Sequence, residues 1–205
     1  MVEEFCLVPL SELTTSITDG DHSAPPKSGE GIPFITISKI NKKTREIDFS
    51  DTFRVPEDYF NGLKDNRKPK YGDVLYTVTG SYGIPVKVPE DKKFCFQRHI
   101  GLLRPKPNIN SSWLYYGLLS PLAFQQASAG ATGTAQKTVS LSVLRNICIP
   151  KMRQQDQDFV VKHLDHKWEK TQRLETLYQK KLTALTELKQ SILQKAFSGE
   201  LTANS

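Results

Sequence analysis

Residues 156–197 read DQDFVVKHLDHKWEKTQRLETLYQKKLTALTELKQSILQKAF, and this stretch decides the architecture of the chain. Apolar or small side chains recur along it every three or four residues, which places them on one stripe of an α-helix. No Gly or Pro interrupts the run, and Lys, Glu, Gln and Leu dominate it, so intrinsic helix propensity agrees with the pattern. The sequence therefore predicts one long C-terminal helix.

This helix needs something to cover its apolar stripe. At 1.5 Å per residue it would reach roughly 60 Å, and a small domain of the same chain could not bury a stripe of that length. The sequence therefore predicts a partner helix from a second copy; the alternative is a helix folded back over its own domain. The positions expected at the helix–helix contact are Leu164, Trp168, Leu174, Tyr178, Leu182, Leu185, Leu188 and Ile192.

Composition bounds the remaining possibilities. The chain has 205 residues, 38% hydrophobic and 24% charged, enough for a core in one or two domains. No apolar run approaches the roughly 18 residues of a membrane helix, and MVEEFCLVPL lacks the features of a signal peptide. Cys6, Cys95 and Cys148 are odd in number and far apart, which predicts reduced, mostly buried thiols in a cytoplasmic protein.

The positive charge is concentrated before the helix. Residues 1–155 carry 20 Lys and Arg against 15 Asp and Glu, whereas residues 156–205 carry 8 against 7. The nearly neutral helix is typical of a protein–protein seam. The basic remainder is compatible with a nucleic-acid partner, although many basic proteins bind none.

The chain before the helix alternates short strands with loops. Strand-like runs are predicted within 7–13 and at 31–40, 74–78, 84–88, 94–96, 100–104 and 146–149. A helical turn is predicted at 59–63, and a helix, broken or kinked near Pro121, at 113–128. Between the strands, Gly80-Ser81-Tyr82-Gly83 predicts a hairpin turn. The fold class is therefore α+β, with a mixed α/β domain at 1–152 followed by the long helix at 153–205.

Catalytic sites are weakly indicated. His22 beside Asp19 and Asp21 could be drawn as a metal or acid–base site, but a hydrogen-bonded turn is the better interpretation. His163 and His166 with Asp165 lack a further ligand on their helix. Glu90-Asp91-Lys92, with Asp73 upstream, has a nuclease-like form that is frequent by chance. We find no phosphate-binding or cofactor-binding glycine motif, and we expect no catalytic residue, cofactor or metal.

Several motifs, in order along nearly the whole chain, resemble one half of a type I restriction-modification specificity (S) subunit. The matching segments are Asp19-Gly20-Asp21-His22, Gly31-Ile32-Pro33-Phe34-Ile35 with Ile40, Tyr71-Gly72-Asp73-Val74-Leu75, Gly80-Ser81-Tyr82-Gly83, Gln97, Ile149-Pro150 and, the most specific, the run from Leu188 to Leu201 that ends in Ala196-Phe197-Ser198-Gly199-Glu200-Leu201. One departure is Lys151-Met152-Arg153-Gln154 where the family has a proline pair and Leu, although Gln157 still matches.

The resemblance implies one target recognition domain and one conserved spacer helix. In this family two such helices pair as an antiparallel coiled coil, hold two domains that each read half of a split DNA site, and dock methyltransferase (M) subunits, through which the restriction (R) subunit joins. Two copies of this chain would pair about a twofold axis. The alternative function is a coiled-coil scaffold that binds protein without DNA specificity.

DNA reading requires cations for phosphates and polar side chains for base edges. The expected phosphate contacts are Lys39, Lys42, Lys43, Arg45 and Lys137, which lie on loops or strand ends. The expected base or groove contacts are Ser81, Tyr82, Thr132, Thr134 and Gln136, where small neighbouring residues let the backbone approach DNA closely. Each of them could instead be an ordinary solvated loop residue.

Overall fold

A computed structural model of the chain describes residues 6–22, 24–90 and 92–199. The chain divides into two compact units after Val161. We call residues 6–161 the head, and we describe the head and the rest of the long helix each by itself. The predicted assignment of residues 1–152 to a DNA-binding domain and 153–205 to a spacer helix concerns function and stays a prediction.

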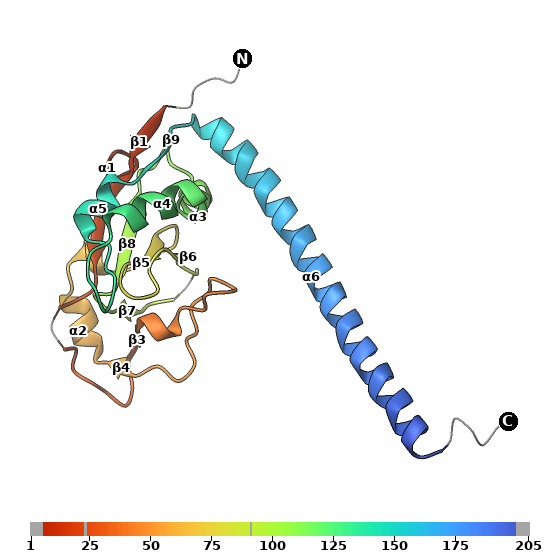
Figure 1. The fold of residues 1–205 in the computed structure, drawn as a ribbon. Helices are drawn as coiled ribbons and strands as arrows, with labels where there is room; N and C mark the ends of the chain where they lie inside the picture. The colour runs from red at the N-terminus through yellow and green to blue at the C-terminus, as the bar shows by residue number, and fades with distance from the viewer. Residues whose placement is uncertain (1–5, 23, 91, 200–205) are drawn as a thin grey trace. The chain divides into compact units, whose positions relative to one another are not determined.

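A four-stranded antiparallel sheet forms the centre of the head (Figure 1). Its order is β2 (Thr14–Asp19), β8 (Ile100–Pro105), β5 (Val74–Thr77) and β6 (Pro85–Lys87). Both faces of β5 are buried because its side chains alternate between two cores. Val74 and Tyr76 face the first core, and Leu75 faces the second.

Helices cover the first face of this sheet. They are α3 (Ser111–Leu119), α4 (Pro121–Gly130) and α5 (Leu141–Asn146), and they supply Leu114, Leu118 and Leu144 to the first core. The helix predicted to be broken or kinked near Pro121 is broken there, between Leu119 and Pro121. Ser120 ends α3 and caps α4, where its Oγ accepts a hydrogen bond from the backbone N–H of Ala123, and proline suits the first helical position that follows.

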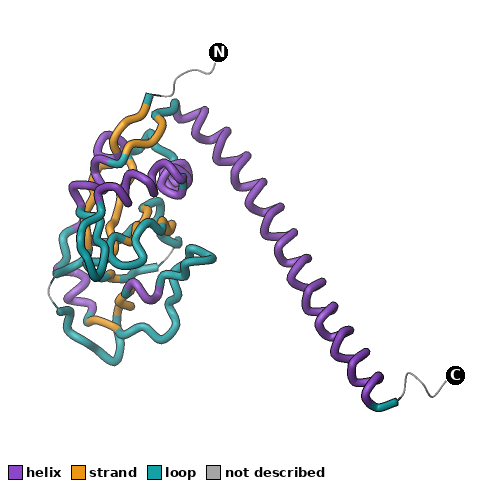
Figure 2. The backbone as a smooth tube through the Cα atoms, viewed as in Figure 1, coloured by secondary structure: helices purple, strands orange, loops and turns teal. Residues whose placement is uncertain are grey.

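Smaller elements complete the head (Figure 2). Strand β3 (Ile32–Ile35) pairs antiparallel with β4 (Arg54–Val55) and parallel with β7 (Cys95–Phe96), while β1 (Leu7–Pro9) pairs with β9 (Cys148–Pro150). The remaining helical turns are α1 (Leu10–Leu13), η1 (Ile37–Lys39), α2 (Glu57–Gly62) and η2 (Asp65–Arg67).

The mixed α/β fold and the predicted central strands are confirmed, but three local predictions are wrong. Strand β3 ends at Ile35, since the chain turns into η1 instead of continuing to Ile40. Residues 141–146 form α5, capped by the Ser140 hydroxyl, where a turn was predicted. Strand β2 was missed, because Ile17 is the one apolar side chain in its sequence TTSITD.

The long helix α6 spans Gln154–Phe197, as its periodicity predicts. Its first two turns belong to the head, where Gln157 and Val161 are buried. The Gln157 amide oxygen accepts a hydrogen bond from the backbone N–H of Asn110 at 2.8 Å, and its nitrogen donates to the Met152 carbonyl at 2.8 Å. Gln157 and Val161 therefore anchor the start of α6 in the head.

The cysteines carry no disulfide among the described residues. Cys95 is buried, Cys148 is half-buried and Cys6 is exposed, so the expectation of mostly buried thiols holds for Cys95 alone. Burial, and then the nearby Asp21 carboxylate, raises the pKa of the Cys95 thiol to about 12. Cys95 is accordingly an unreactive core side chain.

Candidate nucleic-acid interface

Five loops gather at one end of the four-stranded sheet. Asp19 pairs with Gly101, Thr77 pairs with Ile100, and Tyr76 pairs with Pro85, so the chain leaves β2 and β5 and enters β6 and β8 at the same end. We call residues 19–22, 36–39, 78–83, 97–99 and 132–138 the loop surface. It contains all five of the predicted base or groove contacts.

Gln97 connects the end of β2 in the four-stranded sheet with β3 of the three-stranded sheet at this surface. Its backbone N–H donates to the Ile35 carbonyl at 2.9 Å, and its side-chain oxygen accepts from the Ile37 N–H at 3.3 Å. Gln97 also forms a parallel bridge with Asp21. A Cβ on Gly20 would lie 2.0 Å from the Phe96 carbonyl oxygen, so only glycine permits this close backbone approach.

Backbone hydrogen bonds tie three of the loops together. The Val78 N–H donates to the His99 carbonyl at 2.9 Å, and the Val139 N–H donates to the Val78 carbonyl at 2.8 Å. The Gly80 N–H donates to the Lys137 carbonyl at 2.9 Å. The glycine-flanked hairpin turn and the small-residue loop, 51 residues apart between Gly80 and Ala131, are therefore direct neighbours.

The predicted contacts in the small-residue loop face solvent. Thr132, Thr134, Gln136 and Lys137 are all exposed, and within the described ranges no partner is seen for the side chains of Gln136 and Lys137. The loop itself is held closed by paired hydrogen bonds between the backbones of Thr132 and Thr138, at 3.0 and 2.8 Å. It can therefore present polar groups from a fixed backbone.

The predicted contacts in the hairpin turn are partly occupied by internal packing. The Tyr82 ring stacks on Phe124 with centroids 5.8 Å apart, and its hydroxyl donates to Ser128 Oγ at 3.1 Å. The Ser81 carbonyl accepts a hydrogen bond from Thr77 Oγ1 at 2.7 Å. Both side chains are half-buried, so this turn contributes shape to the surface as much as polar groups.

The segment from Lys39 to Arg45 leaves the loop surface after η1. Lys39 Nζ donates to the Ser50 carbonyl at 2.8 Å and lies 3.7 Å from Asp48, which ties this cation to its own loop. Lys42 and Lys43 are exposed on the turn that follows, and Arg45 there has a φ of 58°. Ile40 and Ile47, on either side of this turn, pack on the second core.

Two basic residues of the loop surface were missed at the sequence level. Arg98 is exposed and His99 is half-buried, and both line an open groove of about 410 Å³ with Gln136 and Thr138. Burial, and then the charge of Arg98, lowers the pKa of His99. The available signal was position, since this basic pair directly follows the strand predicted at 94–96.

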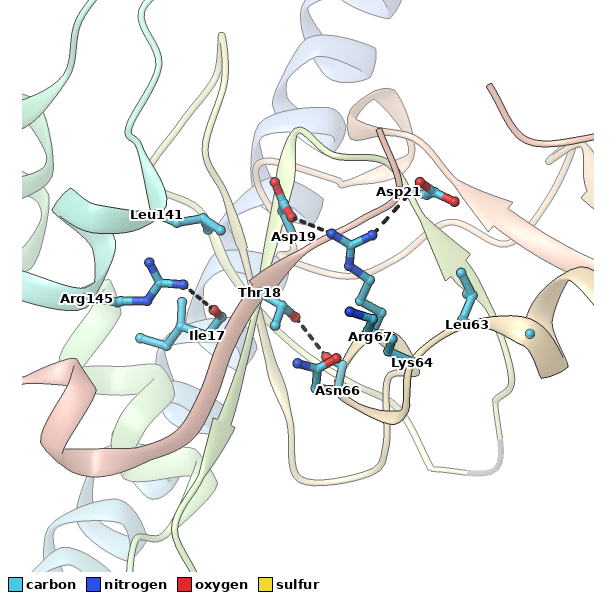
Figure 3. A pocket seen from close by; sticks show the side chains of 11 residues that line it. Ile17, Thr18, Asp19, Asp21, Leu63, Lys64, Asn66, Arg67, Leu141 and Arg145 are labelled. Carbon is cyan, nitrogen blue, oxygen red and sulfur yellow. Dashed lines mark hydrogen bonds and ion pairs between the residues drawn. The ribbon is translucent and has the colours of Figure 1, made fainter. Parts of the chain in front are cut away.

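A neighbouring pocket of about 410 Å³ is lined by the ion-paired Arg67, Asp19 and Asp21 (Figure 3). Arg67 lies 3.6 Å from an Asp19 oxygen and 3.9 Å from an Asp21 oxygen. His22 Nε2 lies 2.8 Å from Asp19, and the Tyr59 hydroxyl donates to Asp21 at 3.0 Å. Burial, followed by Asp21, raises the Tyr59 pKa above its ordinary value.

These contacts favour the structural interpretation of His22, Asp19 and Asp21. Arg67 supplies the compensating charge for both carboxylates, and in the described parts of the chain no group of three His, Cys, Asp or Glu side chains is arranged to hold a metal ion. Arg145, which lines the same pocket, donates to the Ile17 carbonyl at 3.0 Å. The contacts of Arg67 and Arg145 thus hold the end of β2 and the turn at 19–22 in place.

The residues of the nuclease-like pattern, Asp73, Glu90 and Lys92, have other contacts or face solvent. Both oxygens of the buried Asp73 carboxylate accept hydrogen bonds from Arg104, at 3.0 and 2.9 Å, and one also accepts from the Lys70 N–H at 2.9 Å. Glu90 is exposed, Lys92 Nζ lies 5.9 Å from the centre of the Phe49 ring, and Asp91 lies outside the described residues. Asp73 therefore has a structural role, as the buried partner of Arg104.

The long helix carries an exposed apolar stripe beyond Val161. Relative exposure is 53% at Leu174, 61% at Tyr178, 60% at Leu185 and 49% at Ile192. The other predicted contact positions are Leu164, which is half-buried, and Trp168, Leu182 and Leu188, which are exposed. These exposed apolar side chains make the stripe a candidate interaction site. Within the described residues, no helix is long and apolar enough to cross a membrane.

Comparison with known proteins places these features in a family. Residues 18–194 match the family described as the type I restriction modification DNA specificity domain. The chain is 27% identical over 175 residues to the type I restriction enzyme EcoBI specificity subunit of Escherichia coli, and this match covers 85% of the chain and 36% of the relative. The chain thus spans about a third of the length of that curated relative.

Solved structures share the fold. One match is a chain from a structure that concerns the complex assembly and conformational transition of the type I R-M system. Its TM-score is 0.72 and its identity 22%, and the match covers 96% of this chain and 46% of that chain. The HsdS subunit from Thermoanaerobacter tengcongensis matches with a TM-score of 0.60 and 22% identity, over 85% and 40% of the two chains. The S subunit from M. genitalium matches with a TM-score of 0.53 and 17% identity, over 86% and 43%.

Proposed function

The chain belongs to the family of type I restriction modification DNA specificity domains, and from that premise we propose that its head reads one half of a bipartite DNA site. The carrying observation is that the family match spans residues 18–194 and so includes both the loop surface and most of α6. The same proposal assigns α6 to pairing with a second copy, or with a second such helix, so that two heads are held a fixed distance apart.

The loop surface supports the DNA-reading part of the proposal. Its loops are fixed by backbone hydrogen bonds, and exposed polar side chains stand on them, notably Thr134, Gln136 and Lys137. We assign phosphate contacts to Lys42, Lys43, Arg45 and Lys137, with Lys39 in a supporting position because Ser50 and Asp48 hold its ammonium group. Base contacts are assigned to Thr132, Thr134 and Gln136, and shape to Ser81 and Tyr82.

The apolar stripe supports the pairing. With 44 residues, α6 is about 66 Å long, and its large apolar side chains from Leu174 onward are roughly half exposed. An isologous antiparallel pair would cover them and place the two heads at opposite ends, related by a twofold axis. The length and register of the pair then set the gap between half-sites.

The outer face of the paired helices is the proposed docking surface for methyltransferase subunits, through which a restriction subunit would join. In this arrangement the chain supplies specificity and performs no catalysis of its own. Co-purification with a methyltransferase subunit tests the docking. Incubation of the chain alone with DNA and Mg²⁺ tests the absence of nuclease activity, and cleavage that requires Glu90 would contradict it.

Selection from a randomised duplex pool tests the central part of the proposal. Two identical heads related by a twofold axis should select an inverted repeat, two half-sites separated by a fixed gap. A single undivided motif would contradict the paired arrangement. A dimer that retains no DNA, alone or with methyltransferase subunits, would favour a coiled-coil scaffold instead.

A further inference from the structure

The groove beside the small-residue loop contains polar groups that the fold itself does not use. It is an open groove of about 410 Å³ whose walls include Thr79, Arg98, His99, Gln136 and Thr138. Four segments, 19–22, 78–79, 98–99 and 136–141, line it, and hydrogen bonds from Val139 to Val78 and from Val78 to His99 tie the last three together. The groove therefore has a fixed backbone, while side chains from different loops converge in it.

Arg98 differs from the other arginines whose contacts define the head. Arg54 donates to the Gly31 carbonyl, Arg104 to Asp73 and Arg145 to the Ile17 carbonyl. The guanidinium group of Arg98 is exposed, and among the described residues it has no carboxylate or carbonyl partner. Five N–H donors in a planar fork are thus available to a ligand.

Gln136 faces the same groove from the opposite loop. Its side-chain nitrogen lies 2.8 Å from the place where a Cβ would stand on Gly80, a residue with a φ of +69°. Glycine at position 80 therefore leaves the space that the Gln136 side chain occupies. The Gln136 amide is positioned against fixed backbone, and within the described parts of the chain no hydrogen-bond partner is seen for it.

These two side chains match two different base edges. An arginine fork donates two hydrogen bonds to O6 and N7 of guanine, whereas a glutamine amide pairs with N6 and N7 of adenine. We propose that this groove reads base edges in the DNA major groove, with Arg98 selecting a guanine and Gln136 selecting an adenine of the half-site. This inference rests on the proposed DNA-reading function and names the groups that give it specificity.

The competing role for Arg98 is a phosphate contact, which would strengthen binding to every sequence equally. Lysine distinguishes the two roles because it keeps the charge needed at a phosphate but loses the planar fork. We therefore compare Arg98→Lys, Arg98→Ala and Gln136→Ala with the unsubstituted chain. Lys106→Ala is the matched control, because Lys106 is exposed just past the other end of β8.

The probe is a randomised duplex pool, followed by affinity measurements on the selected site and its single-base variants, with the full chain and co-expressed methyltransferase subunits. Arg98→Ala should relax one guanine position and reduce discrimination there by about 5- to 150-fold, and Arg98→Lys should restore little of it. Gln136→Ala should relax an adenine position instead. Lys106→Ala should leave the motif unchanged.

Three results would overturn the inference, and they are distinguishable. If both Arg98 variants select the original motif with the original affinity, the residue does not contact DNA. If Arg98→Ala weakens all sequences equally and Arg98→Lys restores them, the residue contacts a phosphate. If the unsubstituted chain selects no motif, the proposed DNA-reading function fails together with this inference. Thermal unfolding of each variant confirms that the exposed substitutions leave the head folded.

Discussion

The proposed phosphate contacts can be tested by the salt dependence of DNA binding. Lys42 and Lys137 are exposed, stand on separate loops of the head, and have no partner among the described residues. Each phosphate contact releases condensed counterions, so log K falls with log salt by about 0.9 per contact. The Lys42→Ala, Lys137→Ala double variant should therefore have a slope shallower by about 1.8.

The size of the effect follows from this slope. Between about 50 and 200 mM salt, two contacts account for about a 12-fold loss of affinity, and the double variant should lack that part of the loss. Fluorescence anisotropy with a labelled duplex, measured across the salt range, gives the slope directly. Lys106→Ala is the control, because this exposed lysine follows the opposite end of β8. Equal slopes for the double variant and the unsubstituted chain would refute the placement of both contacts.

Three further predictions concern pairing, stability and reactivity. Leu185→Asp places a charge on the apolar stripe, so the mass measured by sedimentation equilibrium should fall from twice 23.2 kDa to 23.2 kDa. The control Thr183→Asp, on another face of α6, should leave the dimer intact in the same measurement. Asp73→Asn weakens the ion pair with Arg104, in which the Asp73 side chain is only 3% exposed. The free energy of unfolding, measured by urea denaturation, should fall by about 3 kcal/mol. Asp65→Asn, which changes the exposed carboxylate that also pairs with Arg104, should alter it little. Cys95, with its pKa raised to about 12 by burial, should resist alkylation at neutral pH until the head unfolds, so rapid labelling in the native protein would contradict its placement.

Local patterns in the sequence were sufficient for the elements that carry a strong period. Helix α6 follows from apolar steps of three and four without Gly or Pro, and β5 and β8 follow from continuous apolar runs that a doubly covered sheet requires. Strand β2 carries mostly polar residues, and its place at the sheet edge is set by pairing with β8. That pairing is a long-range property that no local pattern contains.

The site was predictable in part for the same reason. Gly80 and Gly83 predicted a turn, and the small-residue loop predicted a close backbone approach. That the two lie side by side depends on bridges between Thr79, Thr132 and Thr138, which only the folded register provides. Lys39 was predicted as a phosphate contact, and that assignment stays a prediction. Local sequence did not indicate that Asp48 and the Ser50 carbonyl also hold its ammonium group, because the chain turns back after Ile40.

The spacing of the two half-sites tests the central claim most directly. Duplicating residues 182–188 adds seven residues to α6 and keeps the apolar stripe in phase, and the two added turns lengthen each helix by about 10 Å. If paired helices hold the heads apart, the gap in the selected DNA site should lengthen, by at most about three base pairs, with unchanged half-sites. An unchanged gap in a dimer that still binds would contradict the account.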